Sequence, residues 1–268
     1  MPSSDTPQFN ASPQHPAHQV DGGEGRKGGA SKGVLSDFEN LRTERNQVLP
    51  GWGRAAQEKL KNARVLVIGC GGLGSPLLLG LAAAGVGTIT LCEDDVLDAS
   101  NLNRQVLYKA AEIGEEKAPL AAQRLQELSP ELQVACVGRF TRDNGVMLAK
   151  NHDLVIDASD NFATRYLASD LCQQAGATLV WGSVLQYAGQ LSVFPPEGPT
   201  LRDIYPEPPT NPPNNADAGV LGVAAHTIGS LMAFEAIKVL TGVGEPLVGR
   251  LMTVDGLTMR TRIFAIKH

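Results

Sequence analysis

The stretch Arg64-Val65-Leu66-Val67-Ile68-Gly69-Cys70-Gly71-Gly72-Leu73-Gly74 decides the fold. Residues 64–68 form an apolar run, which is typical of a strand buried on both faces of a parallel sheet. Glycines follow at once, and the small, aliphatic residues 75–84 predict a helix packed closely on that sheet. A strand, a glycine turn and a helix in this order form the context that a nucleotide-binding loop requires.

The alternation of strands and helices continues along the chain. Further strands are predicted at residues 87–92, 132–137, 153–157 and 178–181, and further helices at residues 117–128 and 163–175. This pattern predicts an α/β fold with a Rossmann-like, doubly wound and mostly parallel sheet. We expect a C-terminal antiparallel portion to extend the sheet, because the pattern there changes to strands at 189–194, 248–254 and 258–266, with a turn at Asp255-Gly256 and a long apolar helix at 219–240.

The chain divides into a tail and one domain. Residues 1–35 are rich in Pro, Ser, Gly, His and Gln, so we expect a disordered tail that cannot offset its chain entropy by burial. Residues 36–268 form a single domain that begins with helices at 36–45 and 57–61. Its parts are the N-terminal helices at 36–63, a nucleotide-binding half at 64–184, and a second half at 185–268 with a proline-rich crossover at 195–215. The crossover is too dense in proline for regular structure.

Composition excludes several classes of function. With 268 residues and 43% hydrophobic content, the chain can bury a full core, and its net charge of -5 argues against a nucleic-acid partner. No run is predicted to be long and apolar enough to span a bilayer, and we see no secretory signal. The cysteines form no C-x-x-C pair, so we expect free thiols in a cytoplasmic protein. They are Cys70, Cys92, Cys136 and Cys172.

The glycine loop carries a nucleotide-binding pattern. Gly69, Gly71 and Gly74 satisfy G-x-G-x-x-G, and glycines let phosphates approach backbone N–H groups at a helix N-terminus. Glu93 follows about 20 residues later, where an acid normally binds a ribose hydroxyl. NAD-linked oxidoreductases share all of these features, so the loop alone leaves the nucleotide open.

The next polar stretch, Ser100-Asn101-Leu102-Asn103-Arg104-Gln105, separates these alternatives. It resembles the S-N-L-x-R-Q motif of the ubiquitin-activating-enzyme-like superfamily, and in particular the MoeB, ThiF and HesA adenylyltransferases that act on ubiquitin-like sulfur carriers. The resemblance covers about residues 40–266. Other segments similar to that family follow its order: Arg45-Asn46-Gln47-Val48-Leu49-Pro50-Gly51, the glycine loop, Gly114-Glu115-Glu116-Lys117-Ala118, Asp157-Ala158-Ser159-Asp160-Asn161 and Ala218-Gly219-Val220-Leu221-Gly222.

The resemblance implies roles for individual residues in binding ATP and magnesium. Arg104, Lys117 and an Arg45 supplied across a dimer interface would be catalytic cations on the phosphates. Asp160 would be catalytic as the magnesium ligand, since this hard cation prefers oxygen. Asp157 stays open between a structural anchor and a functional acid. The other implied nucleotide contacts are Gly69, Gly71, Gly72, Gly74, Glu93, Ser100, Asn101, Asn103 and Asn161.

The chain also departs from the family it resembles. Many relatives hold a structural zinc with two C-x-x-C pairs, but Thr200 and Asp203 occupy the first pair's places and the sequence ends at His268, before a second. We therefore expect no zinc site, and a mobile crossover held by packing alone. Asn215 stands where relatives often carry a cysteine that links to the carrier, and Cys172 is expected to be an inert core thiol.

The leading hypothesis is ATP- and magnesium-dependent adenylation of the C-terminal Gly-Gly carboxylate of a ThiS- or MoaD-like sulfur carrier. The enzyme would stop at the acyl-adenylate, and a separate sulfurtransferase or cysteine desulfurase would deliver sulfur. The pathway stays open between thiamin, molybdopterin and a specialised metabolite. A homodimer is implied by the resemblance, and no nucleic acid or membrane is expected as a partner. The rival hypotheses are an NAD(P)-binding oxidoreductase and a non-catalytic scaffold of the same family.

Overall fold

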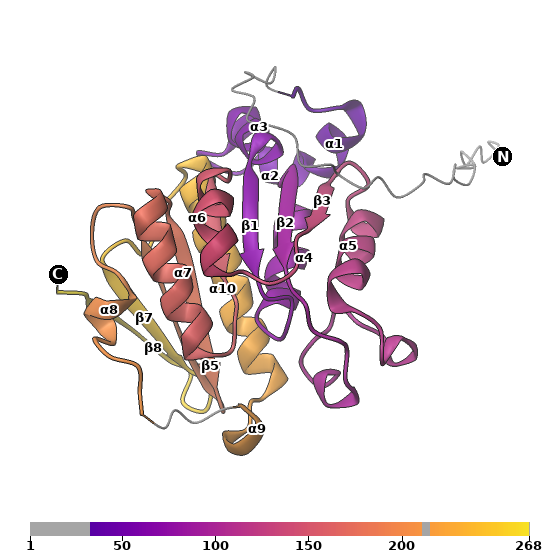
Figure 1. Cartoon of the computed structure of the whole chain (residues 1–268). Helices are drawn as coiled ribbons and strands as arrows, with labels where there is room; N and C mark the ends of the chain where they lie inside the picture. Colours follow the sequence, from indigo (N-terminus) through magenta and orange to yellow (C-terminus); the bar gives the residue numbers. More distant parts are fainter. Residues whose placement is uncertain (1–32, 211–214, 268) are drawn as a thin grey trace. The chain divides into compact units, whose positions relative to one another are not determined.

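The computed structural model describes residues 33–210 and 215–267, so most of the predicted tail lies outside the described residues (Figure 1). The described chain folds around an eight-stranded sheet of order β3-β2-β1-β4-β5-β6-β7-β8. Its first five strands are mutually parallel and the last three are antiparallel, as predicted. The strands are β1 (Arg64–Ile68), β2 (Thr88–Cys92), β3 (Gln133–Cys136), β4 (Leu154–Asp157), β5 (Leu179–Leu185), β6 (Ala188–Phe194), β7 (Arg250–Asp255) and β8 (Arg260–Ala265).

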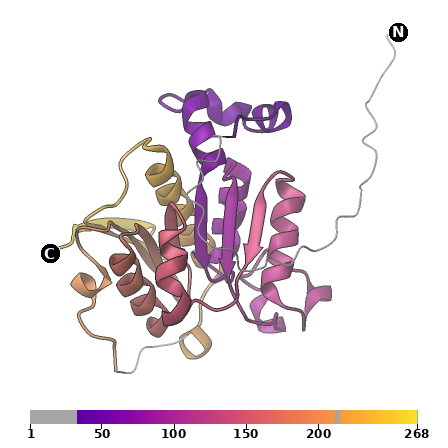
Figure 2. The same cartoon turned by 45° about the horizontal axis from the view of Figure 1, so that its top comes forward.

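Helices cover the sheet on both sides, which confirms the doubly wound architecture (Figures 1 and 2). Alternate residues of β1 enter opposite cores: Val65 and Val67 lie in one, Leu66 and Ile68 in the other. The apolar run is buried on both faces for this reason. The first core receives side chains from α3 (Gly53–Asn62), α4 (Gly74–Ala84), α5 (Lys117–Leu128) and α10 (Gly222–Thr241), and the second from α6 (Arg142–Lys150) and α7 (Phe162–Ala175).

Helices α4 and α10 pack closely because both carry glycine at the contact. A Cβ on Gly80 would lie 3.2 Å from Ala233 Cβ, and one on Gly229 only 2.3 Å from the carbonyl oxygen of Leu73. With a mean hydropathy of 1.4, α10 is long and apolar enough to cross a membrane by length and composition, so the expectation that no run reaches this limit is wrong. Its packing on α4, β5 and β6 makes it a core helix of this domain.

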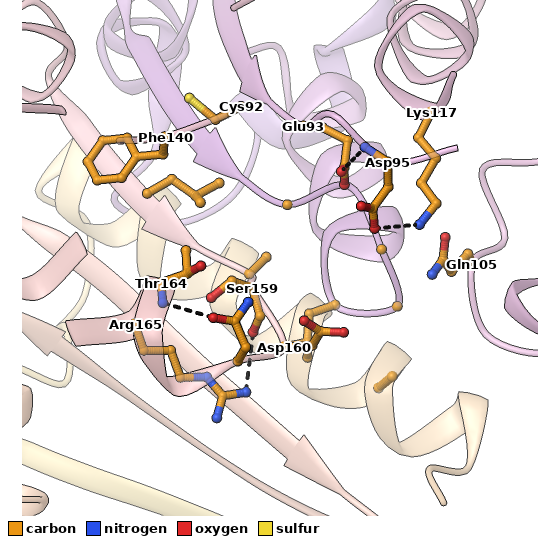
Figure 3. A pocket seen from close by; sticks show the side chains of 18 of the residues that line it. Cys92, Glu93, Asp95, Gln105, Lys117, Phe140, Ser159, Asp160, Thr164 and Arg165 are labelled. Atoms are coloured by element: carbon orange, nitrogen blue, oxygen red, sulfur yellow. Dashed lines mark hydrogen bonds and ion pairs between the residues drawn. The ribbon is translucent and has the colours of Figure 1, made fainter. Parts of the chain in front are cut away.

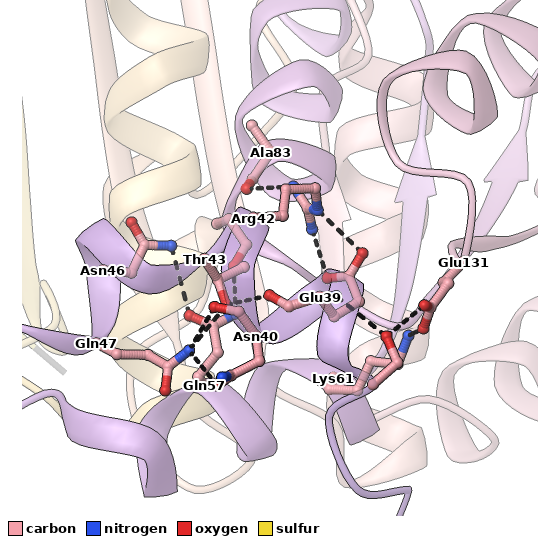
Figure 4. Close-up of polar contacts among 12 residues, drawn as sticks. Glu39, Asn40, Arg42, Thr43, Asn46, Gln47, Gln57, Lys61, Ala83 and Glu131 are labelled. Atoms are coloured by element: carbon pink, nitrogen blue, oxygen red, sulfur yellow. Dashed lines mark hydrogen bonds and ion pairs between the residues drawn. The ribbon is translucent and has the colours of Figure 1, made fainter. Parts of the chain in front are cut away.

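Within the described residues, three short helices precede the sheet. The helix predicted at 36–45 is divided at Thr43 into α1 (Asp37–Arg42) and α2 (Glu44–Gln47). A polar network joins them to the end of α4 (Figure 4). In that network Arg42 donates to both carboxylate oxygens of the buried Glu39, at 2.9 and 2.7 Å, and to the carbonyl of Ala83 at 2.8 Å.

The domain begins earlier than the predicted boundary. The Gly33 N–H donates to Asn62 Oδ1 at 2.7 Å, and Leu35 is buried. Ser36 caps α1 by accepting from the Glu39 N–H at 3.0 Å. Residues 33–35 therefore belong to the domain and not to the tail, because Leu35 and these hydrogen bonds tie them to it.

Helix α6 was not predicted from the sequence. Gly145 near its middle weakens helix propensity, yet a Cβ there would lie 2.5 Å from Leu171 Cδ1 on α7. The glycine therefore permits close packing of α6 on α7, which the local pattern cannot reveal. Short elements complete the described chain: the 3₁₀ helices Ala99–Asn101 and Ala110–Glu112, and the helices α8 (Leu201–Ile204) and α9 (Asn215–Ala218).

The crossover contains α8, so the prediction that it lacks regular structure is wrong. Thr200 and Asp203 form a capping box at the start of this helix: the Thr200 N–H donates to Asp203 Oδ2 at 2.7 Å. Arg202 then donates to both oxygens of Asp170 on α7, at 2.9 and 2.7 Å, while Leu201 is buried. Residues 200–204 are therefore held by hydrogen bonds and an ion pair as well as by packing. Our expectation that packing alone holds the crossover is wrong for this segment.

Candidate functional site

A pocket of about 350 Å³ opens at the carboxyl ends of β1, β2 and β4. Parallel doubly wound sheets bind ligands at this edge, where the strand order reverses between β1 and β4. Lys117 and Asp95 lie on one side of the pocket and Asp160 and Arg165 on the other (Figure 3). The predicted site residues that line it are Gly69, Gly71, Gly72, Glu93, Arg104, Lys117, Asp160 and Asn161.

The glycine loop has the geometry of a phosphate-binding turn. Gly69 has a φ of +93°, and a Cβ on Gly74 would lie 2.3 Å from the carbonyl oxygen of Gly69. Gly74, although outside the pocket lining, is therefore needed to close the turn. Within the described residues, the N–H groups of Gly71 and Gly72 make no hydrogen bond. Free donors just before the N-terminus of α4 form a site for an anion.

Glu93 stands at the end of β2, where the sequence predicted a ribose-binding acid. Its Oε2 accepts from the Cys70 N–H at 2.8 Å, and its Oε1 accepts from the N–H groups of Asp94 and Asp95 at 3.0 Å each. These bonds fix the carboxylate against the glycine loop. A carboxylate oxygen has more than one lone pair, so Glu93 can still accept from a ligand hydroxyl.

Two ion pairs extend this acidic edge. Lys117 is buried, and its Nζ lies 3.2 Å from Asp95 Oδ2. Asp94 accepts from the exposed Arg139 at 3.0 Å. The carboxylate oxygens of Glu93, Asp94 and Asp95 lie within 4.8 Å of one another, so this edge concentrates negative charge around one buried lysine.

The loop that carries Arg104 is held by its own hydrogen bonds. Arg104 Nη1 donates to the Ser100 carbonyl at 2.8 Å and to Asn103 Oδ1 at 3.1 Å. Asn101 Oδ1 accepts from the Asp98 N–H at 3.2 Å. Three predicted nucleotide contacts, Ser100, Asn101 and Asn103, therefore do not line the pocket; in this structure they shape the loop that presents Arg104.

The first turns of helix α10 contact the backbone of the same loop. His226 Nε2 lies 2.9 Å from the Arg104 carbonyl oxygen. A Cβ on Gly222, the first residue of α10, would lie 2.2 Å from the carbonyl oxygen of Asn103, so only glycine fits there. This explains why a glycine turn opens the late helix: it allows the loop of Arg104 to lie directly on the helix start.

The segment after β4 brings a carboxylate to the pocket. Asp157 is fully buried, and its Oδ1 accepts from the Ser159 N–H at 2.9 Å. Burial raises the pKa of Asp157, and the hydrogen bond from Ser159 opposes that shift. Asn161 caps α7 by accepting from the Thr164 N–H at 2.9 Å. Asp160, between them, is exposed. Asp157 thus holds the loop through Ser159, which favours the structural alternative; a functional role for this acid stays a prediction.

Several residues that line the pocket were given no role from the sequence. Gln105, the last residue of the S-N-L-x-R-Q motif, is buried beside Gly71, and Arg139 and Phe140, which the sequence did not single out, follow the carboxyl end of β3. Arg165 comes from the first turn of α7. Their position after a strand could have identified Arg139 and Phe140, because parallel strands end at the same edge of the sheet. No local pattern could have identified Arg165, since its place depends on how α7 packs.

Other predicted residues lie away from this pocket. Arg45 is exposed on α2 and is not among the lining residues of its own chain, so its role stays a prediction. Cys172 is a buried thiol, as expected, and burial raises its pKa to about 12. The side chain of Asn215 lies outside the described residues, so its comparison with cysteine stays a prediction as well.

The strand order, the glycine turn and the acid after β2 define a Rossmann-like nucleotide-binding α/β protein. The ThiF family model matches residues 43–268, and the chain belongs to the ThiF family. This confirms the family resemblance of the motifs. The chain is 46% identical over 242 residues to the Mycobacterium tuberculosis protein named probable adenylyltransferase/sulfurtransferase MoeZ, and 45% identical over 236 residues to the Thermus thermophilus sulfur carrier protein adenylyltransferase.

The matches differ in how much of each relative they cover. They cover 87% of this chain but 62% of MoeZ, and 85% of this chain and 87% of the Thermus protein. The chain thus spans less than two thirds of the length of MoeZ. Among solved structures, Microcin C7 biosynthetic enzyme MccB in complex with N-formylated MccA matches with a TM-score of 0.75 at 20% identity, over 88% of this chain and 75% of that one. At this identity the likeness shows a shared fold.

Proposed function

We propose that this chain is an adenylyltransferase that uses ATP to activate the C-terminal Gly-Gly carboxylate of a small ubiquitin-like sulfur carrier. The observation that carries the proposal is one pocket bordered by free glycine-loop N–H groups, a buried lysine and an exposed carboxylate. Figure 3 shows the lysine, Lys117, and the carboxylate, Asp160, on opposite sides of it. The names of the MoeZ and Thermus relatives support the reaction and the substrate class. The nucleotide is supported by E. coli MccB, a protein of the same fold whose crystal structure has been solved with ATP.

The phosphates would bind between the glycine loop and Lys117. The free N–H groups of Gly71 and Gly72 and the dipole of α4 favour negative charge there. Lys117 adds a point charge, and Arg104 adds a planar fork once it leaves its own loop carbonyl. Because charge builds on the phosphate oxygens during adenylation, these fixed donors would stabilise the transition state.

Asp160 fits the role of magnesium ligand by the chemistry of its surroundings. The neighbouring acids are already engaged: Glu93 by backbone N–H groups, Asp94 by Arg139 and Asp95 by Lys117. The carboxylate of Asp160 makes no hydrogen bond or ion pair with the described residues, so it is available to a hard cation. Bound magnesium would neutralise part of the phosphate charge.

The carrier tail would enter along the apolar wall of the pocket. Val184 at the end of β5, Val220 and Ala225 form that wall beside the antiparallel half of the sheet. Two glycines have no side chains and so suit a narrow apolar path. One carboxylate oxygen of the tail would attack the α-phosphorus, the bond to the β-phosphate oxygen would break, and pyrophosphate would leave. The attacking carboxylate is already ionised, so positioning is the main task of the protein.

We infer that the reaction ends at the acyl-adenylate. Cys70, Cys92 and Cys172 are buried, and burial raises the pKa of Cys92 and Cys172 to about 12, so these thiols are not available for a covalent link to the carrier. Cys136 is exposed but does not line the pocket. A separate sulfurtransferase or cysteine desulfurase would then supply sulfur. Thr200 and Asp203 do not fit a structural zinc site, because Thr200 Oγ1 donates to Asp203 Oδ2 at 3.0 Å and a hydroxyl is not one of the sulfur or nitrogen ligands that such sites use.

Exchange of labelled pyrophosphate into ATP tests the proposal. We expect exchange that requires magnesium and a carrier ending in Gly-Gly, and its loss in Asp160→Asn. The matched control is Asp143→Asn on the exposed surface of α6, which should exchange like wild type. Thermal unfolding with ATP and magnesium, compared with NAD, separates the oxidoreductase alternative, since a ligand stabilises the state it binds. Stabilisation by NAD alone, with no exchange for any carrier, would refute the proposal.

A further inference from the structure

A buried pair of opposite charges lies behind Asp160. Asp157 at the end of β4 is fully buried, and Arg165 on α7 is 5% exposed. They act on the two sides of one residue, Ser159: its N–H donates to Asp157 Oδ1 at 2.9 Å, and its carbonyl accepts from Arg165 Nη2 at 3.2 Å. Both backbone polar groups of Ser159 are thus held by side chains, immediately before Asp160 in the chain.

The pair is not arranged for maximal stability. Asp157 Oδ2 and Arg165 Nε are buried and make no hydrogen bond within the described residues, and neither does the hydroxyl of Ser159. Burying charged groups with atoms left unpaired costs free energy, and an apolar pair of similar size often stabilises a protein as well or better. What the two charged side chains do is hold the backbone of Ser159, through the hydrogen bonds to its N–H and carbonyl.

Arg165 is itself held rigidly. Its guanidinium lies 5.1 Å from the ring centroid of Phe162, a cation–π contact, and the Phe162 ring packs edge-on against Tyr205 of the crossover at 5.9 Å. Asn161 caps the same helix. The backbone on both sides of Asp160 is therefore fixed, from Ser159 before it and from Asn161 after it.

We propose that Asp157 and Arg165 are positioning residues: by holding the N–H and carbonyl of Ser159, they orient the Asp160 carboxylate toward the pocket for a divalent cation. This inference rests on the proposed function, because Asp160 is the metal ligand there. Partners that hydrogen-bond a metal ligand directly typically contribute 10- to 100-fold to metal affinity, and we expect the lower end of that range for partners that act through the Ser159 backbone. Their loss should weaken metal binding while the phosphate contacts of the glycine loop stay intact.

The test is Arg165→Met, which removes the donor to Ser159 and keeps a chain of similar length. The readout is Mn²⁺ binding to the enzyme–ATP complex, followed by electron paramagnetic resonance without any carrier. We expect affinity for Mn²⁺ to fall about tenfold. The magnesium concentration for half-maximal pyrophosphate exchange should rise by a similar factor, with the rate at saturating magnesium within about twofold. Arg165→Lys, which can still donate to the carbonyl, should recover most of the loss.

A second variant shows whether a loss of Mn²⁺ affinity in Arg165→Met comes only from leaving the charge of Asp157 buried without its partner. The double change Asp157→Asn with Arg165→Met removes both buried charges, keeps an acceptor for the Ser159 N–H, and should show the same loss of Mn²⁺ affinity. Unchanged Mn²⁺ binding in both variants would overturn the proposal, as would a raised KM for carrier or for ATP at saturating metal, since Arg165 would then contact a substrate. Asp160→Asn is the reference: if it too leaves Mn²⁺ binding unchanged, the proposed metal ligand itself is wrong.

Discussion

Lys117 Nζ lies 3.2 Å from Asp95 Oδ2, although the lysine side chain is 5% exposed and the aspartate side chain 65% exposed. The Lys117 N–H also donates to the Asp95 carbonyl at 2.9 Å, so main chain and side chain both hold the start of α5 at the pocket. Because Asp95 is exposed, its carboxylate can be solvated by water when the Lys117 ammonium moves to bind a ligand phosphate instead. This arrangement places a positive charge at the site before the nucleotide arrives.

Replacing this lysine should therefore disable the reaction. We expect Lys117→Met to lower kcat/KM for pyrophosphate exchange by about 100- to 1000-fold, the usual loss for one electrostatic donor to a transition state. Steady-state exchange measures it, and Lys150→Met on the exposed end of α6 is the matched control. Retention of more than about half of the wild-type activity by Lys117→Met would show that Lys117 does not contact the reacting phosphates.

The role of Arg45 depends on a second copy of the chain. If Arg45 completes the partner's site, Arg45→Ala and Asp160→Ala are each inactive, but a mixed dimer holds one intact site. Random mixing of the two variants should restore about a quarter of the wild-type exchange activity, for a two-fold symmetric dimer. Co-refolded mixtures measured by exchange, with sizing chromatography alongside, test this. No recovery, or a monomer in solution, would leave Arg45 without this role.

Cysteine reactivity should differ sharply along the chain. Burial raises the pKa of all four cysteine thiols, to about 12 for Cys92 and Cys172, but Cys136 alone of the four is exposed to solvent. Iodoacetamide at pH 8 should therefore modify Cys136 first in the folded protein, as read by peptide mass spectrometry.

Removal of a buried thiol should leave the chemistry intact. We expect Cys172→Ala to keep wild-type pyrophosphate exchange, because the proposed reaction forms no bond to sulfur. Alkylation of native Cys172, or loss of exchange in Cys172→Ala at unchanged stability, would instead point to a covalent step on this cysteine.

His152 makes stability depend on pH. Its Nδ1 lies 2.7 Å from the Leu148 carbonyl and its Nε2 2.7 Å from Thr90 Oγ1, and burial lowers its pKa from the ordinary 6.5. As pH falls below 6.5, the His152 imidazole takes up a proton more readily in the unfolded chain than in the folded protein. The contribution of neutral His152 to the free energy of unfolding is therefore complete above pH 6.5 and is lost as pH falls through the folded-state pKa. Urea unfolding between pH 5 and 7 should show the free energy of unfolding rising with pH, by a total of roughly 1.4 kcal/mol for each unit by which the pKa is lowered. His152→Gln should flatten it; an equal slope in the variant would assign the effect to other groups.

The crossover should be stable without metal. Leu201→Ala removes a fully buried side chain and should cost about 2–5 kcal/mol in the free energy of unfolding. Arg202→Ala breaks a largely exposed ion pair with Asp170 and should cost less than about 1 kcal/mol. EDTA should leave the Tm unchanged. A lowered Tm with chelator, together with one zinc per chain by elemental analysis, would contradict a metal-free anchor.

Much of the site follows from local patterns. The apolar run before Gly69, the acid after β2 and the loop at Arg104 are contiguous in sequence, and parallel strands must bring their carboxyl ends to one edge. The same argument could have found Arg139 and Phe140 after β3. It could not separate Arg104 from Ser100, Asn101 and Asn103, because which side chain of a loop faces the pocket depends on the turn that Asn101 and Gly222 impose.

By itself, the sequence determined the doubly wound sheet, the phosphate-binding turn and membership of the ThiF family. These rest on hydrophobic period, glycine spacing and motif order, which are local properties of the chain. Only the tertiary structure decided that Asp160, among the described acids that line the pocket, has no hydrogen bond or ion pair, that Lys117 is buried, and that Arg165 reaches Ser159 from α7. Those facts depend on hydrogen bonds and burial between segments far apart in sequence, and no local pattern encodes which partner a charged side chain will meet.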